Sequence, residues 1–391
     1  MTALVCQHFI AGRCRSCRLL EYPPAEARER QLSSLREILG FRIDLSAPVW
    51  CRSPAGSRIR GRLAVAGTVE RPMFGFFNEL QQVVPAADCP LHHPLLTEIT
   101  GWLADFVKAA RLEPYSVESD RGELKFVVLT ASPSSGKLMV QWVLRSQEAV
   151  DRIRSVWRRL SAVERSGVSV MSAGIQPRRS TQIICDVDLP ISEERSLRVD
   201  YPQPRLSLLV SAGGFVQTNY EIAGELYAAA RVRLEALRPR RVLDLYCGSG
   251  GFSFIAAECG AEVLGVDVSA ASIACANMGA QEQGLRAEFL HCAAGASDVE
   301  NRAGRVDAVI CNPPRAGLED SAISLVQRLA PECLLYSSCN PATLQRDLSR
   351  LGDMYEVAWV QPFDMFPGTT HWEVLCEARL RSPEKIGSDF S

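Results

Sequence analysis

The sequence predicts an α/β protein in which a doubly wound, mostly parallel sheet follows a separate α+β region. Short apolar strand patterns alternate with helical patterns from about residue 241 onward, and this alternation is typical of parallel sheets with right-handed crossovers. A glycine-rich turn stands between the first of these strands and the first helix. Before residue 240 the strand and helix patterns do not alternate, which favours an α+β arrangement for that part.

The C-terminal half contains seven apolar runs bounded by turn residues, as expected for strands buried in a sheet. In chain order they are RVLDLYC, EVLGVD, AEFLHC, VDAVICN, CLLYSSC, MYEVAWV and HWEVLCEARL. Helices are expected through Ala256–Glu258, from Ser269 to about Gln283, over about 319–329 and after Pro341. The last two strands have no helix between them, so we expect them to close the sheet.

The N-terminal half has a less regular pattern. Its first 24 residues are rich in cysteine and arginine. We expect helices at 25–39, 94–112, 147–163 and 221–237. The strand patterns are KFVVLTAS, KLMVQWVLRS, STQIICDVDL, SLRVDYP and RLSLLVSAGGFVQ. Their order along the chain does not predict a topology.

Composition indicates a globular protein of two or three domains. The chain has 391 residues, of which 47% are apolar and 23% are charged, enough for a sizeable core. It has no run of 18 apolar residues and no long apolar segment after a basic N-terminus, so we expect neither a transmembrane helix nor a signal peptide. Fourteen cysteines without a secretion signal favour a reducing compartment, which we take to be the cytoplasm.

Charge is unevenly distributed along the chain. Residues 1–71 contain twelve arginines, no lysine and six acidic residues. That segment therefore carries about +6, while the remainder carries about −8, within a formal net charge of −2. Such asymmetry is typical of a polyanion-binding face, and a solvated arginine-rich surface is an equally simple interpretation.

A cysteine stands where a strand ends and a helix begins. In LLYSSCNPATLQRDL the apolar strand stops near Cys339, because Pro341 cannot extend a strand and disfavours helix at Asn340. Pro341 is well placed as an early helix residue. Ligands of open α/β sheets bind at the carboxyl ends of the strands. Cys339 is therefore a candidate functional thiol, although buried cysteines are more often inert packing.

The glycine turn predicts a nucleoside site. In VLDLYCGSGGF, Asp244 lies in a strand, and Gly248, Gly250 and Gly251 lie in the turn before a helix. The acidic residue disfavours a nearby phosphate. The next strand ends at Asp267, where an acidic side chain can bind ribose hydroxyls. Together these features favour S-adenosylmethionine, with an NAD-binding fold as the main alternative.

The fourth strand ends in the sequence CNPPRAGL. The two prolines stop the strand sharply and expose Asn312 at the ligand edge, unless the segment is a simple strand-ending loop. An aromatic residue after Asn-Pro-Pro would suggest methylation of an exocyclic amino group. Arg315 follows instead, which disfavours that reaction.

Four cysteines near the N-terminus have metal-ligand spacing. Cys6, Cys14 and Cys17 form a C-x7-C-x2-C pattern, and Cys89 follows at a distance. Four cysteines suit either a structural zinc ion or an iron–sulfur cluster, and spacing alone leaves the two nearly even. The C-x3-C-x2-C spacing of radical S-adenosylmethionine enzymes is absent.

The motifs together resemble the RNA uracil-C5 methyltransferase family. FVQTNY, LDLYCGSGGF, CNPPRAGL, YSSCNPATLQRDL and DMFPGTTHWEVL occur in the family's order and spacing over residues 215–375. The N-terminal cysteines extend the resemblance to the bacterial 23S rRNA branch, and the chain is most similar to members that modify uracil-747. The resemblance implies a C-terminal Rossmann-like S-adenosylmethionine-dependent methyltransferase domain and an N-terminal α+β region carrying a 4Fe–4S cluster.

The resemblance also implies roles for individual residues. Cys339 would be the nucleophile and Glu373 the general base. The methyl donor would be bound by Gln217, Tyr246, Asp267 and Asn312. The 4Fe–4S ligands would be Cys6, Cys14, Cys17 and Cys89. Thiolate addition to C6 would activate C5 of the base, so we expect the pKa of Cys339 to be lowered by the adjacent helix start and by the donor.

These roles predict three regions. Residues 1–90 would hold the cluster and begin the RNA-binding region, residues 91–214 would form an α+β substrate-binding region, and residues 215–391 the methyltransferase domain. We expect a monomer that acts on 23S rRNA and not on membranes. The alternatives are the same reaction on another 23S uridine or on tRNA, a non-catalytic iron–sulfur RNA-binding factor, and more distantly an NAD-dependent enzyme.

Overall fold

The computed structural model describes residues 4–40, 45–79, 82–179 and 185–381. The chain divides into two compact units. The first comprises Met1–Cys17, Ser53–Asp200 and Leu209–Tyr220. The second comprises Arg18–Arg52, Tyr201–Leu208 and Glu221–Ser391. Both units are therefore built from segments that are distant in sequence.

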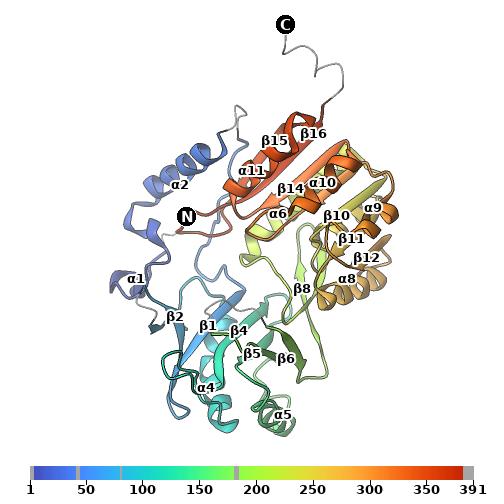
Figure 1. Ribbon diagram of the computed structural model, residues 1–391. Coiled ribbons are helices and arrows are strands. Elements are labelled where there is room, and N and C mark those ends of the chain that lie inside the picture. The colour runs from blue at the N-terminus through green and yellow to red at the C-terminus, as the bar shows by residue number, and fades with distance from the viewer. Residues whose placement is uncertain (1–3, 41–44, 80–81, 180–184, 382–391) are drawn as a thin grey trace. The chain divides into compact units, whose positions relative to one another are not determined.

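The second unit contains the predicted doubly wound sheet, which confirms the Rossmann-like fold (Figure 1). Its strand order is β12-β11-β10-β13-β14-β16-β15. The strands are β10 (Arg241–Leu245), β11 (Glu262–Asp267), β12 (Ala287–His291), β13 (Ala308–Cys311), β14 (Cys333–Ser338), β15 (Tyr355–Phe363) and β16 (Glu373–Leu380). Strands β10 to β14 pair in parallel. Strand β16 pairs antiparallel with β14 and β15.

The strand order reverses between β10 and β13, because the chain runs from β10 to β11 and β12 on one side and returns to β13 on the other. Ligands of such sheets bind at this switch point, beyond the carboxyl ends of the strands. The helices of this unit are η1 (Arg18–Glu21), α2 (Pro24–Leu39), α6 (Tyr220–Leu237), α7 (Gly251–Glu258), α8 (Ala270–Gln283), α9 (Ser297–Ala303), α10 (Asp320–Leu329), α11 (Pro341–Leu351) and η2 (Gly352–Met354).

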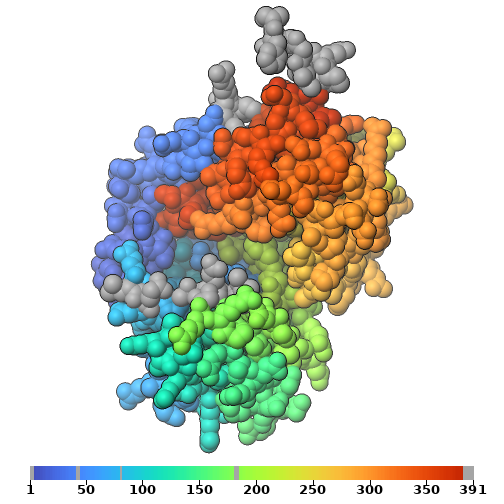
Figure 2. All heavy atoms as spheres, viewed as in Figure 1, coloured from blue at the N-terminus to red at the C-terminus, as the bar shows by residue number. Residues whose placement is uncertain are grey.

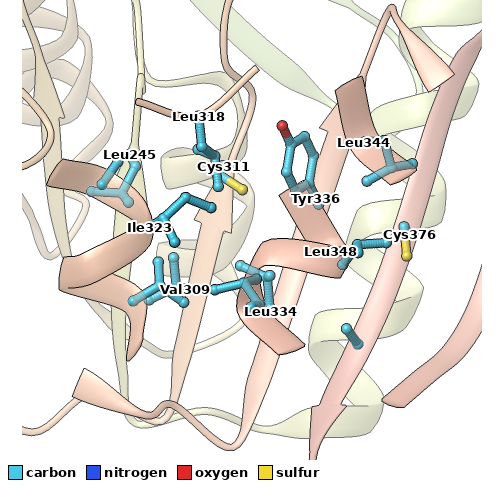
Figure 3. Close-up of a cluster of buried hydrophobic side chains, with 14 of the residues drawn as sticks. Leu245, Val309, Cys311, Leu318, Ile323, Leu334, Tyr336, Leu344, Leu348 and Cys376 are labelled. Carbon is cyan, nitrogen blue, oxygen red and sulfur yellow. The ribbon is translucent and has the colours of Figure 1, made fainter. Parts of the chain in front are cut away.

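Helix α2 is part of the core of the second unit although it lies near the N-terminus of the chain. It lies beside α11 (Figures 1 and 2). Leu35 and Leu39 of α2 belong to the same buried apolar cluster as Leu344 and Leu348 of α11. The cluster continues between the sheet and its helices (Figure 3). Removal of this apolar surface from water, about 25 cal/mol per Å², is the main contribution to holding α2 in place.

The first unit contains a second seven-stranded sheet of order β3-β2-β1-β4-β5-β6-β7. Its strands are β1 (Arg60–Gly67), β2 (Pro72–Phe77), β3 (Val83–Pro85), β4 (Leu124–Ser132), β5 (Lys137–Leu144), β6 (Val168–Ile175) and β7 (Val187–Pro190). All neighbours pair antiparallel except β5 and β6. Helix α5 (Val150–Arg159) supplies the crossover that a parallel pair needs.

The remaining elements of this part are short. They are α1 (Gln7–Ile10), α3 (Pro94–Glu98) and α4 (Thr100–Ala109). Strands β8 (Ser196–Tyr201) and β9 (Leu206–Ser211) form a separate two-stranded sheet, and its residues 201–208 belong to the second unit. The predicted helix at 94–112 is thus two consecutive helices, and the one at 147–163 is shorter than expected. The start of the predicted strand STQIICDVDL, residues 180–184, lies outside the described residues. No helix in the described part of the chain is long and apolar enough to cross a membrane.

Candidate active site

Cys339 lies between strand β14 and helix α11, as the sequence predicts. Strand β14 ends at Ser338, and Asn340 is the N-cap residue of α11. The backbone N–H of Ala342 donates to Asn340 Oδ1 at 3.3 Å. Pro341 occupies the first helical turn, where its missing N–H costs nothing. The thiol is therefore held at the ligand-binding edge of the sheet.

Glu373 lies beside this strand end because β16 runs antiparallel to β14. Strand β16 begins at Glu373, and its next residue, Val374, pairs with Ser338. The carboxylate is buried, at 2% exposure, and Ser337 Oγ donates to Glu373 Oε1 at 2.6 Å. Burial raises the pKa of Glu373 to about 7, while the Ser337 hydrogen bond opposes the rise. A carboxyl with this pKa is suited to proton transfer near neutral pH.

The protein itself raises the pKa of Cys339. Burial is the largest cause and the nearby Glu373 carboxylate adds to it, giving a value of about 11. The Arg315 guanidinium acts in the opposite direction. Our expectation of a lowered pKa was therefore wrong for the protein alone, because desolvation of a thiolate outweighs the helix start. The same neighbours show that the structure brings Cys339 and Glu373 together.

Arg315 lies near enough to Cys339 to act on its pKa, and sequence reasoning used it only to disfavour another reaction. Its Nη2 lies 3.4 Å from His371 Nδ1. Its carbonyl accepts a 3.0 Å hydrogen bond from Asn340 Nδ2. The loop after β13 is thereby joined to the start of α11, so that the guanidinium stays close to the thiol.

Asp347 of helix α11 holds the loop that follows β13. Sequence reasoning missed this residue. Its side chain is fully buried. Asp347 Oδ2 accepts hydrogen bonds from Leu318 N at 2.7 Å and from the Tyr336 hydroxyl at 2.8 Å. Asp347 Oδ1 accepts from Arg346 Nη2 at 2.6 Å. The available signal was an acidic residue on the apolar face of α11, where a buried charge requires partners.

Three of the four predicted donor-binding residues lie at the carboxyl ends of neighbouring strands. Asp267 ends β11, Tyr246 follows β10 and Asn312 follows β13. Asp267 is oriented by two backbone donors, Gly248 N at 2.9 Å and Ser269 N at 2.8 Å. The acidic group therefore lies against the glycine turn, at the carboxyl ends of the adjacent strands β10 and β11.

The turn itself has the backbone geometry that close approach of a ligand requires. Gly248 and Gly250 have positive φ values of 54° and 89°, and Tyr246 also has a positive φ, 60°. Left-handed backbone at a residue other than glycine is strained and is often found at functional sites. Behind the turn, Ser253 Oγ donates to the buried Asp244 Oδ2 at 2.5 Å.

Gln217 belongs to the first unit, and the structure describes its position within that unit. Its side chain is 3% exposed, and Nε2 has no hydrogen-bond partner among the described residues. The preceding turn is held by Arg60, which donates to the carbonyls of Gly214 at 2.8 Å and Ala212 at 3.3 Å. An unpartnered buried amide next to a fixed turn is available to a ligand.

Four cysteines of the first unit lie close enough to affect one another's ionisation. Burial raises the pKa of Cys17 to about 12, with further contributions from Cys89, Cys14 and Cys6. Burial, with Cys6 and Cys14 among the smaller causes, also raises the pKa of Cys89. No group of three or more His, Cys, Asp or Glu side chains in the described ranges could hold a metal ion as placed. The thiols thus gather in one region without forming a closed ligand set.

A histidine ties the two cysteine-bearing segments together. His8 Nε2 lies 2.7 Å from Asp88 Oδ1, and His8 is buried. The backbone N–H groups of Arg13 and Cys14 donate to the His8 carbonyl. This contact holds helix α1 next to the loop that ends at Cys89.

Comparison with known proteins gives two family matches. Residues 294–378 match the tRNA (Uracil-5-)-methyltransferase family. Residues 242–330 match a general methyltransferase domain family. The two matches cover the sheet edge that carries Tyr246, Asp267, Cys339 and Glu373.

Similar proteins extend the match over almost the whole chain. The chain is 34% identical over 378 residues to the 23S rRNA (uracil(747)-C(5))-methyltransferase RlmC of Yersinia enterocolitica, which covers 95% of this chain and 98% of that protein. The protein of the same name from Yersinia pestis (strain Pestoides F) is 34% identical over 96% of this chain and 99% of its own length.

A solved structure supports the fold. It is the Pyrococcus abyssi tRNA (uracil-54, C5)-methyltransferase in complex with S-adenosyl-L-homocysteine, with a TM-score of 0.73 and 24% sequence identity. The match covers 93% of this chain and 85% of that protein.

Proposed function

The chain belongs to the RNA uracil-C5 methyltransferase family, and from this premise we propose that it methylates C5 of uracil-747 in 23S rRNA. The methyl donor is S-adenosylmethionine. The observation that carries the proposal is the Cys339–Glu373 pair at the ends of β14 and β16, where a nucleophile and a base act on one bound ring. The relatives named for uracil-747 supply the choice of target.

The reaction requires a nucleophile because C5 of uracil is unreactive on its own. The Cys339 thiolate adds to C6, and the ring electrons move to form an enolate. C5 then attacks the methyl group of the donor, the carbon–sulfur bond of the sulfonium breaks, and S-adenosylhomocysteine leaves. Glu373 removes the remaining C5 proton, and the electron pair expels the Cys339 thiolate from C6. The product is 5-methyluridine and the thiolate is regenerated.

Formation of the thiolate is the step for which the neighbours of Cys339 matter most. Burial and Glu373 raise the pKa of Cys339, and Arg315 lowers it. The positive sulfonium of the bound donor acts in the same direction as Arg315. We therefore propose that the thiol ionises after the donor binds, which limits side reactions of a free thiolate.

We propose that Asp267 binds the ribose hydroxyls of the donor. Gln217, Tyr246 and Asn312 are proposed as its further contacts. The backbone bonds that orient Asp267 support its role. The unpartnered buried Nε2 of Gln217 supports the role of that residue.

We also propose a 4Fe–4S cluster held by Cys6, Cys14, Cys17 and Cys89. The chemistry of the donor set supports this proposal, because thiolate ligands suit iron–sulfur clusters and Cys6, Cys14 and Cys89 all contribute to the pKa of Cys17. As placed, the four thiols do not form a closed ligand set among the described residues, so binding of the cluster would have to draw them together. Bound iron would favour the thiolate form that burial alone disfavours. The cluster would order the arginine-rich N-terminal segment, whose Arg13 and Arg15 are suited to phosphate contacts.

The target base must leave its stack to reach a half-buried thiol, so substrate binding includes base flipping. Loops with unstacked bases are the favoured RNA targets of such sites. We propose that the protein acts as a monomer in the cytoplasm, with target choice residing in the first unit.

Covalent trapping tests the proposal. The protein is mixed with S-adenosylmethionine and a 23S rRNA fragment in which 5-fluorouridine replaces uridine. Fluorine cannot leave C5 as a proton, so the reaction stalls as a denaturation-resistant protein–RNA adduct. We expect an adduct at position 747 that is absent with Cys339→Ala. An adduct at another uridine or only with tRNA would change the target, and no adduct from folded protein would favour a non-catalytic RNA-binding factor.

A further inference from the structure

The loop that leads to Glu373 is held by a segment from the other end of the chain. Residues 364–372 connect β15 to β16, and Glu373 is the first residue after this loop. The segment Arg18–Arg52 belongs to the same compact unit. Helix α2 of that segment lies beside α11, whose N-terminus follows Cys339 (Figure 1).

The two ends of the loop are bonded to one side chain of α2. Gln31 Nε2 donates to the carbonyl of His371 at 3.1 Å. The same atom lies 3.4 Å from Asp364 Oδ1, where the loop begins. In return, Trp372 Nε1 donates to the Gln31 carbonyl at 3.1 Å. Gln31 thus joins the first residue of the loop to its last two.

Other residues of the segment support the loop between these points. Leu19 N donates to the carbonyl of Gly368, in the middle of the loop, at 3.0 Å. Cys51 N donates to Asp364 Oδ2 at 3.3 Å. The rings of Trp50 and Trp372 pack with their centroids 5.1 Å apart. Start, middle and end of the loop are therefore all attached to residues 18–52.

Gln31 is an unusual residue for its position. It is 3% exposed on the face of α2 that also carries the buried Leu35 and Leu39. A leucine would fill such a position at lower cost, since a buried amide must find partners to offset its lost hydration. The partners that Gln31 finds are the two ends of the loop before Glu373.

We propose that Gln31 is a positioning residue that keeps the Glu373 carboxylate beside the reacting base. This inference rests on the proposed role of Glu373 as the base that removes the C5 proton. Ser337 is the hydrogen-bond partner of the Glu373 carboxylate among the described residues, and the loop sets where β16 begins. Loss of Gln31 allows the start of β16 to shift, while Cys339, between β14 and α11, keeps its place.

Loss of Gln31 should slow one step of the reaction and leave the earlier steps nearly unchanged. Addition of Cys339 and methyl transfer precede the step that needs Glu373, so both proceed at nearly normal rates. Proton removal slows, and the methylated covalent adduct accumulates on RNA with ordinary uridine. Because general base catalysis contributes about 10²–10⁴-fold, a displaced but present carboxylate should slow product release by roughly tenfold or more.

The experiment uses single-turnover kinetics of the full-length, cluster-loaded protein with S-adenosylmethionine and unmodified 23S rRNA fragment. Label transferred to RNA measures methylation, and protein–RNA adduct that survives denaturation measures the stalled intermediate. Gln31→Leu removes the amide but keeps the volume. Leu35→Ala, one turn further along α2, is the matched control that weakens packing in the same buried cluster without removing a hydrogen bond to the loop. Trp372→Phe removes the reciprocal N–H donor and provides a second variant should Gln31→Leu fold poorly.

We expect Gln31→Leu, and to a smaller degree Trp372→Phe, to accumulate adduct, whereas Leu35→Ala lowers the melting temperature without doing so. The inference is overturned if the Gln31 and Trp372 variants release product as fast as Leu35→Ala at matched folded fraction. Glu373→Gln tests the base role of Glu373 separately from the positioning role of Gln31. If that variant accumulates no adduct, the base role of Glu373 itself fails, and the inference fails with it for a distinguishable reason.

Discussion

Cys17 of the first unit and Cys339 of the second share a raised pKa but differ in the groups around them. Burial raises the pKa of Cys17 in the first unit to about 12 and that of Cys339 in the second to about 11. Three other thiols and the Arg58 guanidinium contribute to the pKa of Cys17, whereas the Glu373 carboxylate and the Arg315 guanidinium contribute to that of Cys339. The direction of the shift is therefore uninformative about role, and the neighbours decide the chemistry.

Buried cysteines of the sheet support this distinction. The pKa of Cys333 is raised to about 12, mainly by burial. It lies at the amino end of β14, away from the ligand edge. Cys333 and Cys339 thus lie at opposite ends of β14, and burial raises the pKa of both thiols. Carboxylate and guanidinium groups act on both thiols, Glu377 with Arg379 and Arg233 on Cys333 and Glu373 with Arg315 on Cys339. Of the two, Cys339 is the one at the carboxyl end of the strand, where ligands bind.

The largest expected effect comes from removing the thiol at the ligand edge. Cys339→Ala should reduce methyl transfer by on the order of 10⁴-fold or more, as loss of a covalent nucleophile does in other enzymes. Donor binding and iron content should stay unchanged. Methylation assays, calorimetry and iron analysis check this. Cys333→Ala, on the same strand, is the control and should retain activity at a lower melting temperature; equal loss in both variants would contradict the comparison.

The reciprocal change removes a thiol from the first unit. Cys89→Ser should abolish iron–sulfur absorbance and bound iron, because a four-cysteine cluster loses a ligand. Donor binding should change by less than about twofold, since the donor residues of the sheet are unaffected. Cys185→Ser, in the same unit, should keep its iron. Retention of zinc in place of iron by the unmodified protein would show the site to be a zinc site.

Local rules of sequence were sufficient for Cys339. A proline stops a strand and starts a helix in any tertiary context, so the strand end, the cap at Asn340 and the helix after it followed from a few residues. The glycine turn and Asp267 followed in the same way, from the order of strand, turn and helix. These features depend on residues that are close in sequence.

Gln31 and Asp347 show what sequence patterns could not reveal. Periodicity predicted a helix at 25–39, but the loop that Gln31 of that helix contacts is formed by residues more than 300 positions later. Asp347 was recognised as part of a helix, yet its partners Leu318 and Tyr336 come from other elements. The direction of the Cys339 pKa shift was also missed, because desolvation depends on all surrounding elements at once.

A smaller effect is expected at the donor-binding end of the second unit. Asp267→Asn keeps a hydrogen-bond acceptor and removes the charge, so it should weaken S-adenosylmethionine binding by roughly tenfold to a hundredfold, the range for hydrogen bonds to charged groups. The rate at saturating donor should change little. Calorimetry and donor-dependent kinetics measure the two quantities. Glu262→Gln, at the other end of the same strand, should leave both unchanged.

The smallest effect tests the carboxylate that lies beside Cys339 at the ligand edge of the sheet. Glu373 acts as a base only when deprotonated, so product release should rise with pH through its pKa of about 7. The Ser337 hydroxyl stabilises the carboxylate and opposes the rise in pKa. Ser337→Ala should therefore move the midpoint to higher pH, by about one unit for one charged hydrogen bond.

The measurement is the single-turnover rate of product release between pH 5.5 and 9. At pH 7 the variant should be slower by less than about tenfold, and at high pH it should recover the rate of the unmodified protein. Ser338→Ala is the matched control, because Ser338 Oγ donates to the Asn340 carbonyl and not to Glu373. A midpoint that moves equally in both variants, or to lower pH in Ser337→Ala, would mean that a group other than Glu373 sets the pH dependence.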